Sequence, residues 1–159
     1  MEQKKGQKGF SLIELLIVVA IIGIIAAIAI PNLLASRRAA NEASAISVLR
    51  TIGTSESTYS STLGFGKYGS MDDLRGASLI DTAIAEAEDA THLKSGYFFG
   101  ISGEDKDDYA AGYESTATQG SSNNGSRNFY SDEAGVIYAK TEASSTPLED
   151  TSGTTPIGN

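Results

Sequence analysis

The chain has 159 residues with no Cys, no Trp and one His, and its formal net charge is −8. A chain of this length accommodates one compact domain besides a single membrane helix. The lack of Cys excludes disulfides and thiolate metal sites, and the acidic balance argues against nonspecific binding of nucleic acid and against adsorption to anionic lipid.

The chain starts with a short polar leader, residues 1–9, which contains Lys4, Lys5 and Lys8. Positive charge directly before an apolar segment favours retention of that end in the cytoplasm. An ordinary secretory signal ends in a cleavage site of small residues, and the Ala-containing stretch 25–30 leaves that alternative open. The apolar segment is nevertheless long for such a signal.

The apolar segment, residues 10–30, has 21 residues, and only Ser11 and Glu14 in it carry polar side chains. A helix of that length spans about 30 Å, which is the hydrocarbon thickness of a bilayer. A carboxylate within hydrocarbon must be neutralised or paired. Once the leader is removed, no Lys, Arg or His lies within one helical turn of Glu14, and the nearest cation is the amine of Phe10.

The stretch KGFSLIELL, residues 8–16, resembles the processing site of type IV prepilins and the related pseudopilins. The order is a basic leader, Gly, an aromatic residue, four further positions ending in Glu, and an apolar helix. The resemblance implies peptidase cleavage between Gly9 and Phe10 and methylation of the new amine of Phe10. It also implies that Glu14 meets the N-terminal amine of a neighbouring subunit during assembly.

This resemblance implies a structural function rather than an enzymatic one. The expected protein is the major subunit of a type IV pilus, held in the inner membrane as a precursor and polymerised through its N-terminal helices into an extracellular filament. The implied partners are the prepilin peptidase, the pilus assembly platform and further copies of the chain. The alternative is a type II secretion pseudopilin that forms a periplasmic pseudopilus. No cofactor, resident metal or direct nucleic-acid site is expected.

Pro31 follows the apolar segment and cannot donate the i→i−4 hydrogen bond of a helix. A kink at Pro31 is expected rather than a helix end, because helical periodicity resumes at once. With Gly23 as a second weak point, the backbone of residues 23–31 is predicted to be the least stable part of the first helix. Residues 10–31 would form the membrane and fibre-core part.

The apolar pattern of residues 32–59 predicts the amphipathic half of the same helix. The whole helix, residues 10–59, would then have about 50 residues and a length of about 75 Å. Arg37 and Arg38 fit headgroup contacts or subunit salt bridges, with a basic patch as the alternative. Glu42 and Arg50 are assigned to the wetter side. The predicted apolar face comprises Ala35, Ala39, Ala43, Ile46, Leu49, Ile52 and Tyr59.

Residues 60–95 are interpreted as a connecting region. Its glycine-rich stretch 64–69 has the spacing G-x-G-x-x-G, but no hydrophobic strand precedes it, so a turn is expected instead of a dinucleotide site. Ser70 and Asp73 predict a capping box for a short helix, residues 71–75. A second helix is expected from Ser78 or Asp81 to about Asp89, with His92 as a capping or surface residue at its exit.

Residues 96–140 alternate in polarity and predict an antiparallel sheet of about four strands in a simple meander. The resulting class is α+β, with a long N-terminal helix packed on a C-terminal sheet, which is the pilin arrangement. The acidic stretch 104–108 predicts a solvated turn, with a Ca²⁺ site as the alternative. Residues 119–126 predict a mobile loop, and residues 141–159 predict a flexible C-terminal tail.

Overall fold

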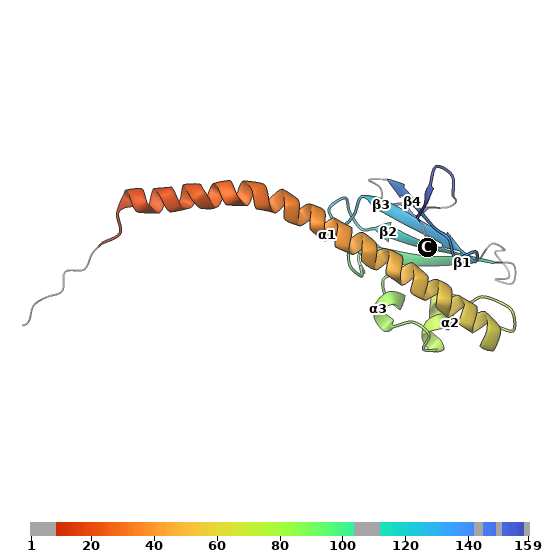
Figure 1. The fold of residues 1–159 in the computed structure, drawn as a ribbon. Coiled ribbons are helices and arrows are strands. Elements are labelled where there is room, and N and C mark those ends of the chain that lie inside the picture. The colour runs from red at the N-terminus through yellow and green to blue at the C-terminus, as the bar shows by residue number, and fades with distance from the viewer. Residues whose placement is uncertain (1–8, 104–111, 142–144, 149–150, 158–159) are drawn as a thin grey trace, which may run out of the picture. The chain divides into compact units, whose positions relative to one another are not determined.

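The computed structural model describes residues 9–103, 112–141, 145–148 and 151–157 (Figure 1). The chain divides into two compact units, Met1–Ser36 and Arg37–Asn159, and the second is called here the globular unit. The described part of the first unit consists of a helical segment and the three residues before it. The globular unit combines the remainder of this helix with two short helices and one antiparallel sheet, which confirms the α+β class.

The long helix α1, Leu12–Thr62, has 51 residues and includes Pro31. It therefore does not end at this proline, as the resumed periodicity predicts. Helix also extends through residues 23–31, so their low stability and the kink remain predictions. The physical argument for both is unchanged, because Pro31 removes one backbone hydrogen bond from the helix.

The sheet has five strands in the order β1-β2-β3-β4-β5, and every neighbouring pair is antiparallel. The first four strands form the predicted meander. The fifth lies in the segment assigned to the tail, where Thr155 pairs with Ala139 and Ile157 with Ile137. Three residues are too few to give a recognisable alternating pattern. The strands are β1 Tyr97–Gly103, β2 Tyr113–Gln119, β3 Arg127–Asp132, β4 Ile137–Thr141 and β5 Thr155–Ile157.

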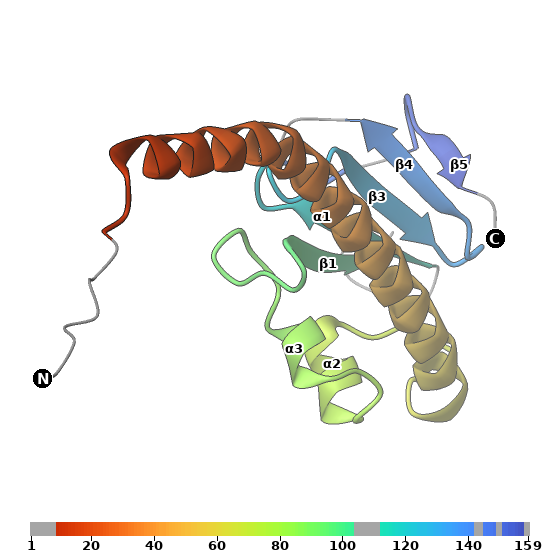
Figure 2. The same ribbon diagram turned by 60° about the vertical axis from the view of Figure 1, so that its left-hand side comes forward.

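The part of α1 in the globular unit crosses one face of this sheet (Figure 2). Leu49 and Ile52 are buried as predicted, and Ile46 and Tyr59 pack against the core from partly buried positions. The predicted face is wrong at its N-terminal end, where three alanines are exposed. The buried stripe of α1 is rotated around the helix axis relative to the predicted one. Alanines are compatible with several helical stripes, so they do not determine which stripe packs against the sheet. The exposed alanines are Ala35, Ala39 and Ala43, and the buried positions missed are Glu42, Ala45, Val48, Ser55 and Glu56.

The connecting region contains helices α2, Met71–Gly76, and α3, Thr82–Ala85. The predicted capping box is confirmed, with Ser70 and Asp73 exchanging side chain–backbone hydrogen bonds. Helix α3 starts after Asp81 as predicted but ends well before Asp89. The chain leaves the helix because the carbonyl of Ala87 accepts a 2.7 Å hydrogen bond from the Phe99 N–H of β1.

The C-terminal end of the loop between β2 and β3 is tied to α1 through Asn41 and Glu42, while the mobility of the stretch 119–126 remains a prediction. The Glu42 carboxylate accepts hydrogen bonds from the backbone N–H (2.9 Å) and hydroxyl (2.8 Å) of Ser126. Its other oxygen accepts from Nε (3.0 Å) and Nη2 (2.8 Å) of Arg127. Asn41 adds a 2.9 Å hydrogen bond to the carbonyl of Asn124. Glu42 is only 7 % exposed, so its assignment to the wetter side was wrong.

Candidate functional site

The sequence places the candidate processing site at Gly9 and Phe10, directly before α1. Both residues are exposed and non-helical, and the side chain of Phe10 is 83 % exposed. A peptidase needs accessible backbone around the bond that it cleaves, and the exposed, non-helical residues Gly9 and Phe10 meet that requirement. Residues 1–8, which include Lys8, lie outside the described residues.

Ser11 and Glu14 are brought together at the start of α1. The backbone N–H of Ser11 donates a 2.9 Å hydrogen bond to Oε2 of Glu14. This is half of a capping box, in which the third helical residue supports the N-cap residue. Glu14 thus stabilises the start of its own helix. The capping box has a sequence signal, because Ser11-Leu12-Ile13-Glu14 has the S-x-x-E spacing. The resemblance to prepilins implies only an assembly role for the Glu14 carboxylate.

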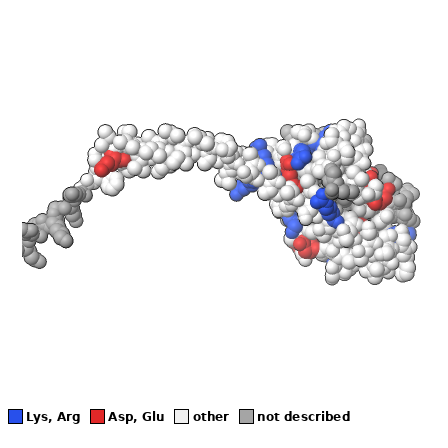
Figure 3. Space-filling model, in the orientation of Figure 1, with Lys and Arg blue, Asp and Glu red and all other residues white. Residues whose placement is uncertain are grey.

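The segment of α1 after Glu14 presents an apolar surface without charge. Residues 15–36 contain no Lys, Arg, Asp or Glu, and Figure 3 shows this stretch as an uninterrupted white surface. The most apolar 18-residue window of α1 has a mean hydropathy of 3.1, and none of it is buried within the structure. By length and composition this helix can cross a membrane. The same exposed surface requires either lipid or other protein around it.

Glu56 is a fully buried carboxyl group on the sheet-facing side of α1. Its Oε2 accepts a 2.8 Å hydrogen bond from the N–H of Gly69, and Oε1 has no hydrogen-bond partner among the described residues. The pKa of Glu56 is raised to about 7, chiefly by burial; the hydrogen bond from Gly69 lowers it in part, and the charge of Asp73 adds to the increase. Sequence reasoning missed this residue, because nothing local marks a glutamate at a core position.

The raised pKa of Glu56 predicts a stability that increases on acidification. The unfolded carboxyl has a pKa near 4.5, so the folded state holds more protons between pH 4.5 and 7, and the free energy of unfolding falls as pH rises through that window. The shift corresponds to roughly 3 kcal/mol at most. In the Glu56→Gln variant, thermal unfolding should no longer show this fall in the free energy of unfolding between pH 4.5 and 7. The matched control, Glu86→Gln at an exposed position, should retain it.

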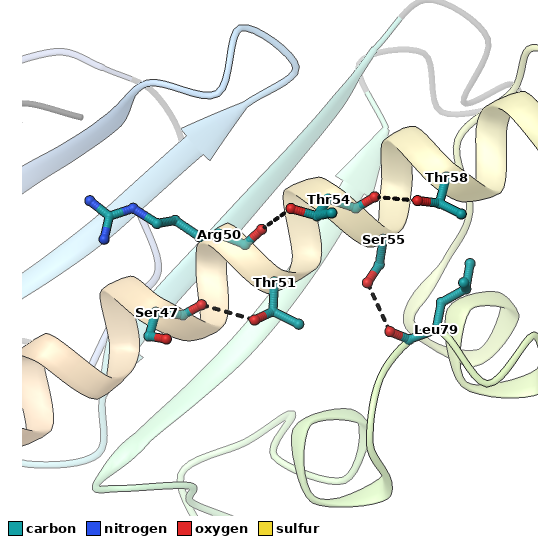
Figure 4. A pocket seen from close by; sticks show the side chains of 7 residues that line it. All are labelled: Ser47, Arg50, Thr51, Thr54, Ser55, Thr58 and Leu79. Atoms are coloured by element: carbon teal, nitrogen blue, oxygen red, sulfur yellow. Dashed lines mark hydrogen bonds between the residues drawn. The ribbon is translucent and has the colours of Figure 1, made fainter.

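A hollow of about 450 Å³ runs along α1 between Ser47, Arg50 and Leu79. Figure 4 shows that four of its hydroxyl groups donate hydrogen bonds to the backbone. Thr51, Thr54 and Thr58 donate to carbonyl oxygens one turn earlier, at 2.8–3.1 Å, and Ser55 donates to the carbonyl of Leu79 at 2.9 Å. No base in this lining activates a hydroxyl, so the hollow does not have the arrangement of a catalytic site.

The two remaining motif candidates have different outcomes. The glycine-rich stretch 64–69 is a turn after α1 with no strand before it, which agrees with its rejection as a dinucleotide site. Stretch 104–108, the candidate Ca²⁺ site, lies outside the described residues. Within the described parts of the chain, no group of three or more His, Cys, Asp or Glu side chains is placed to hold a metal ion.

Comparison with known proteins finds a family model that matches the N-terminal segment and relatives that match parts of the chain. Residues 4–30 match the family model of the prokaryotic N-terminal methylation motif. The type IV wide pilus major component PilA4 of Thermus thermophilus is 66 % identical over 38 residues, which are 24 % of this chain and 29 % of the relative. The type IV major pilin protein PilA of Myxococcus xanthus is 46 % identical over 52 residues, which are 33 % of this chain and 24 % of the relative.

A longer match of lower identity extends into the globular unit. The type II secretion system core protein G of Aeromonas hydrophila is 28 % identical over 95 residues, which are 60 % of this chain and 64 % of the relative. The chain therefore spans less than two thirds of the length of each of these three relatives. No significant match was found among solved structures.

Proposed function

Because its N-terminal segment is similar to that of type IV pilins, we propose that the chain is the major structural subunit of a type IV pilus. The observation that carries the proposal is the processing motif at Gly9, Phe10 and Glu14 followed by a fully exposed apolar helix. After cleavage and methylation at Phe10, the precursor resides in the inner membrane. Assembly transfers the apolar part of α1 from lipid to a bundle of identical helices.

The role of Glu14 follows from this transfer between two environments. In lipid the carboxylate is costly, and its hydrogen bond to the Ser11 N–H compensates only part of that cost. In the bundle it pairs with the Phe10 amine of a neighbouring subunit, which selects the incoming subunit and sets its axial register. Pro31 and Gly23 leave residues 23–31 the weakest helical segment, which allows local rearrangement on assembly.

The test is mass spectrometry of the main protein in filaments sheared from the cell surface, with electron microscopy of the same material. The expected subunit starts at N-methylated Phe10 and keeps the whole apolar segment. A chain that still starts at Met1, or one cleaved after the Ala-containing stretch 25–30, would contradict the proposed processing. A processed chain that is absent from surface filaments would contradict the proposal that the chain is a pilus subunit.

A second candidate is a type II secretion pseudopilin, which the match to core protein G favours. Its subunits would build a short periplasmic structure and would not appear in sheared surface material. The two candidates share the processing step and differ in location. Fractionation of processed subunits between the periplasm and surface filaments therefore distinguishes them.

A further inference from the structure

Large hydrophobic side chains are exposed at two places on the described part of the globular unit. Phe65 is 97 % exposed and Leu63 is 54 % exposed, and both lie in the turn after α1. Leu93 is 39 % exposed in the loop between α3 and β1. The neighbouring pair Leu63 and Phe65 forms a small exposed apolar surface, which a contact with another molecule would cover. Leu63 and Phe65 together are called the knob.

The backbone holds the knob in place. The N–H groups of Leu63 and Gly64 both donate to the carbonyl of Tyr59, at 2.9 and 2.8 Å, and the N–H of Gly66 donates to that of Ser60 at 2.9 Å. Phe65 has a φ of 51°, a conformation that bulky residues rarely adopt. The turn thus keeps an aromatic side chain in solvent at the expense of backbone strain, which an interaction partner would explain.

A small pocket of about 230 Å³ lies beside Leu93. The side chains of Ala83 and Ala87 leave space between them, Leu93 forms an apolar wall, and Glu86 and His92 provide polar groups. Leu93 itself is supported by Gly120, where a Cβ atom would approach its Cδ1 to 2.5 Å. The pocket offers a ring an apolar surface and, through His92, an aromatic contact.

The knob and the pocket lie towards opposite ends of the globular unit. The loop beside the pocket is held to the start of the globular part of α1 by a 3.0 Å hydrogen bond between the hydroxyls of Ser44 and Ser95. The knob follows Thr62, and 18 helical residues separate Ser44 from Thr62, which is about 27 Å along the axis. Figure 2 shows the loop after α3 and the end of α1 apart in this way.

We propose that the knob of one subunit inserts into the Leu93 pocket of a second copy of the chain. A contact between unlike surfaces at opposite ends is heterologous, and its repetition gives an open helical array. The surroundings of the pocket are acidic: Glu86 lines it, and Glu88 and Asp89 line the adjoining hollow, where Arg75 is paired with Asp72. Lys94, next to Leu93, is paired with Asp81, and Lys67 next to the knob carries the opposite charge. The contact covers the side chains of Leu63, Phe65 and Leu93. This inference rests on the proposed function, because the contact is repeated from subunit to subunit only in a filament.

The chain has no Cys, so pairs of introduced cysteines report this contact directly. Phe65→Cys and Leu93→Cys are combined in one full-length chain, and intact filaments are oxidised and separated without reductant. A ladder of dimers, trimers and longer species is expected. The matched control combines Phe65→Cys with Glu133→Cys, which is exposed at the β3–β4 turn, and should give no ladder.

Filaments that form without a ladder would overturn the proposed contact and leave the proposed function intact. Dimers from Phe65→Cys alone would mean that two knobs meet, which would also overturn it. Absence of filaments from the unmodified chain would instead refute the proposed function. If the cysteine variants assemble poorly, Phe65→Leu and Phe65→Ser are compared at equal membrane levels. The proposal expects at least tenfold more filament from Phe65→Leu, and equal yields would refute it.

Discussion

Replacement of Glu14 by Ala should abolish filaments while cleavage between Gly9 and Phe10 continues. In the proposed function the peptidase acts on the segment before the helix, whereas assembly uses the Glu14 carboxylate to pair with the amine of a neighbour. Loss of the hydrogen bond to the Ser11 N–H should cost only about 1 kcal/mol of helix stability, too little to prevent membrane insertion. Filament yield and the N-terminus of the membrane-bound chain are the two measurements.

Glu14→Gln separates assembly from capping in the same experiment. The amide oxygen can still accept the Ser11 hydrogen bond, but the charge is lost. If charge pairing with the Phe10 amine drives assembly, this variant should fail as completely as Glu14→Ala. Normal filaments from Glu14→Gln would show that the capping role is sufficient. Normal filaments from Glu14→Ala would remove Glu14 from assembly altogether.

Replacement of Glu42 by Ala should destabilise the globular unit by about 3 kcal/mol, the low end of the range for a broken buried ion pair, because Arg127 remains partly exposed. The variant loses the four hydrogen bonds from Ser126 and Arg127 that attach the β2–β3 loop to α1. Thermal unfolding of the detergent-solubilised protein measures the loss. The matched control, Glu133→Ala at an exposed position, should change the stability by less than about 0.5 kcal/mol.

The pH dependence gives a second test of Glu42. Burial raises its pKa, but the hydrogen bonds from Ser126 and Arg127 outweigh burial, so the pKa lies below its ordinary value of 4.5. Its stabilisation is therefore complete above pH 4.5 and is lost as pH falls through the lowered pKa. Together with Glu56, this predicts maximal stability near pH 4.5–5. Glu42→Ala should flatten the acid side of the profile, and an unchanged acid side would contradict the assigned ion pair.

Local patterns were sufficient for most of the fold. Alternating polarity located the first four strands, and Ser70 with Asp73 located the start of α2. The continuation of α1 beyond Pro31 followed from the resumed helical period. These features depend on side chains a few residues apart, so one sequence contains them. The strand β5 is different, because its three residues are too few to show an alternating pattern and only the pairing with β4 identifies them as a strand.

The sequence by itself determined the N-terminal segment: the processing motif, the apolar helix and the one carboxylate within it are properties of consecutive residues. Only the tertiary structure decided which stripe of α1 is buried, because alanines fit several stripes and the sheet selects one of them. It also decided the environments of Glu42 and Glu56. One accepts hydrogen bonds from a loop 84 residues away, and the other reaches a turn 13 residues away. The ionisation of both groups depends on these distant contacts, which no local pattern specifies.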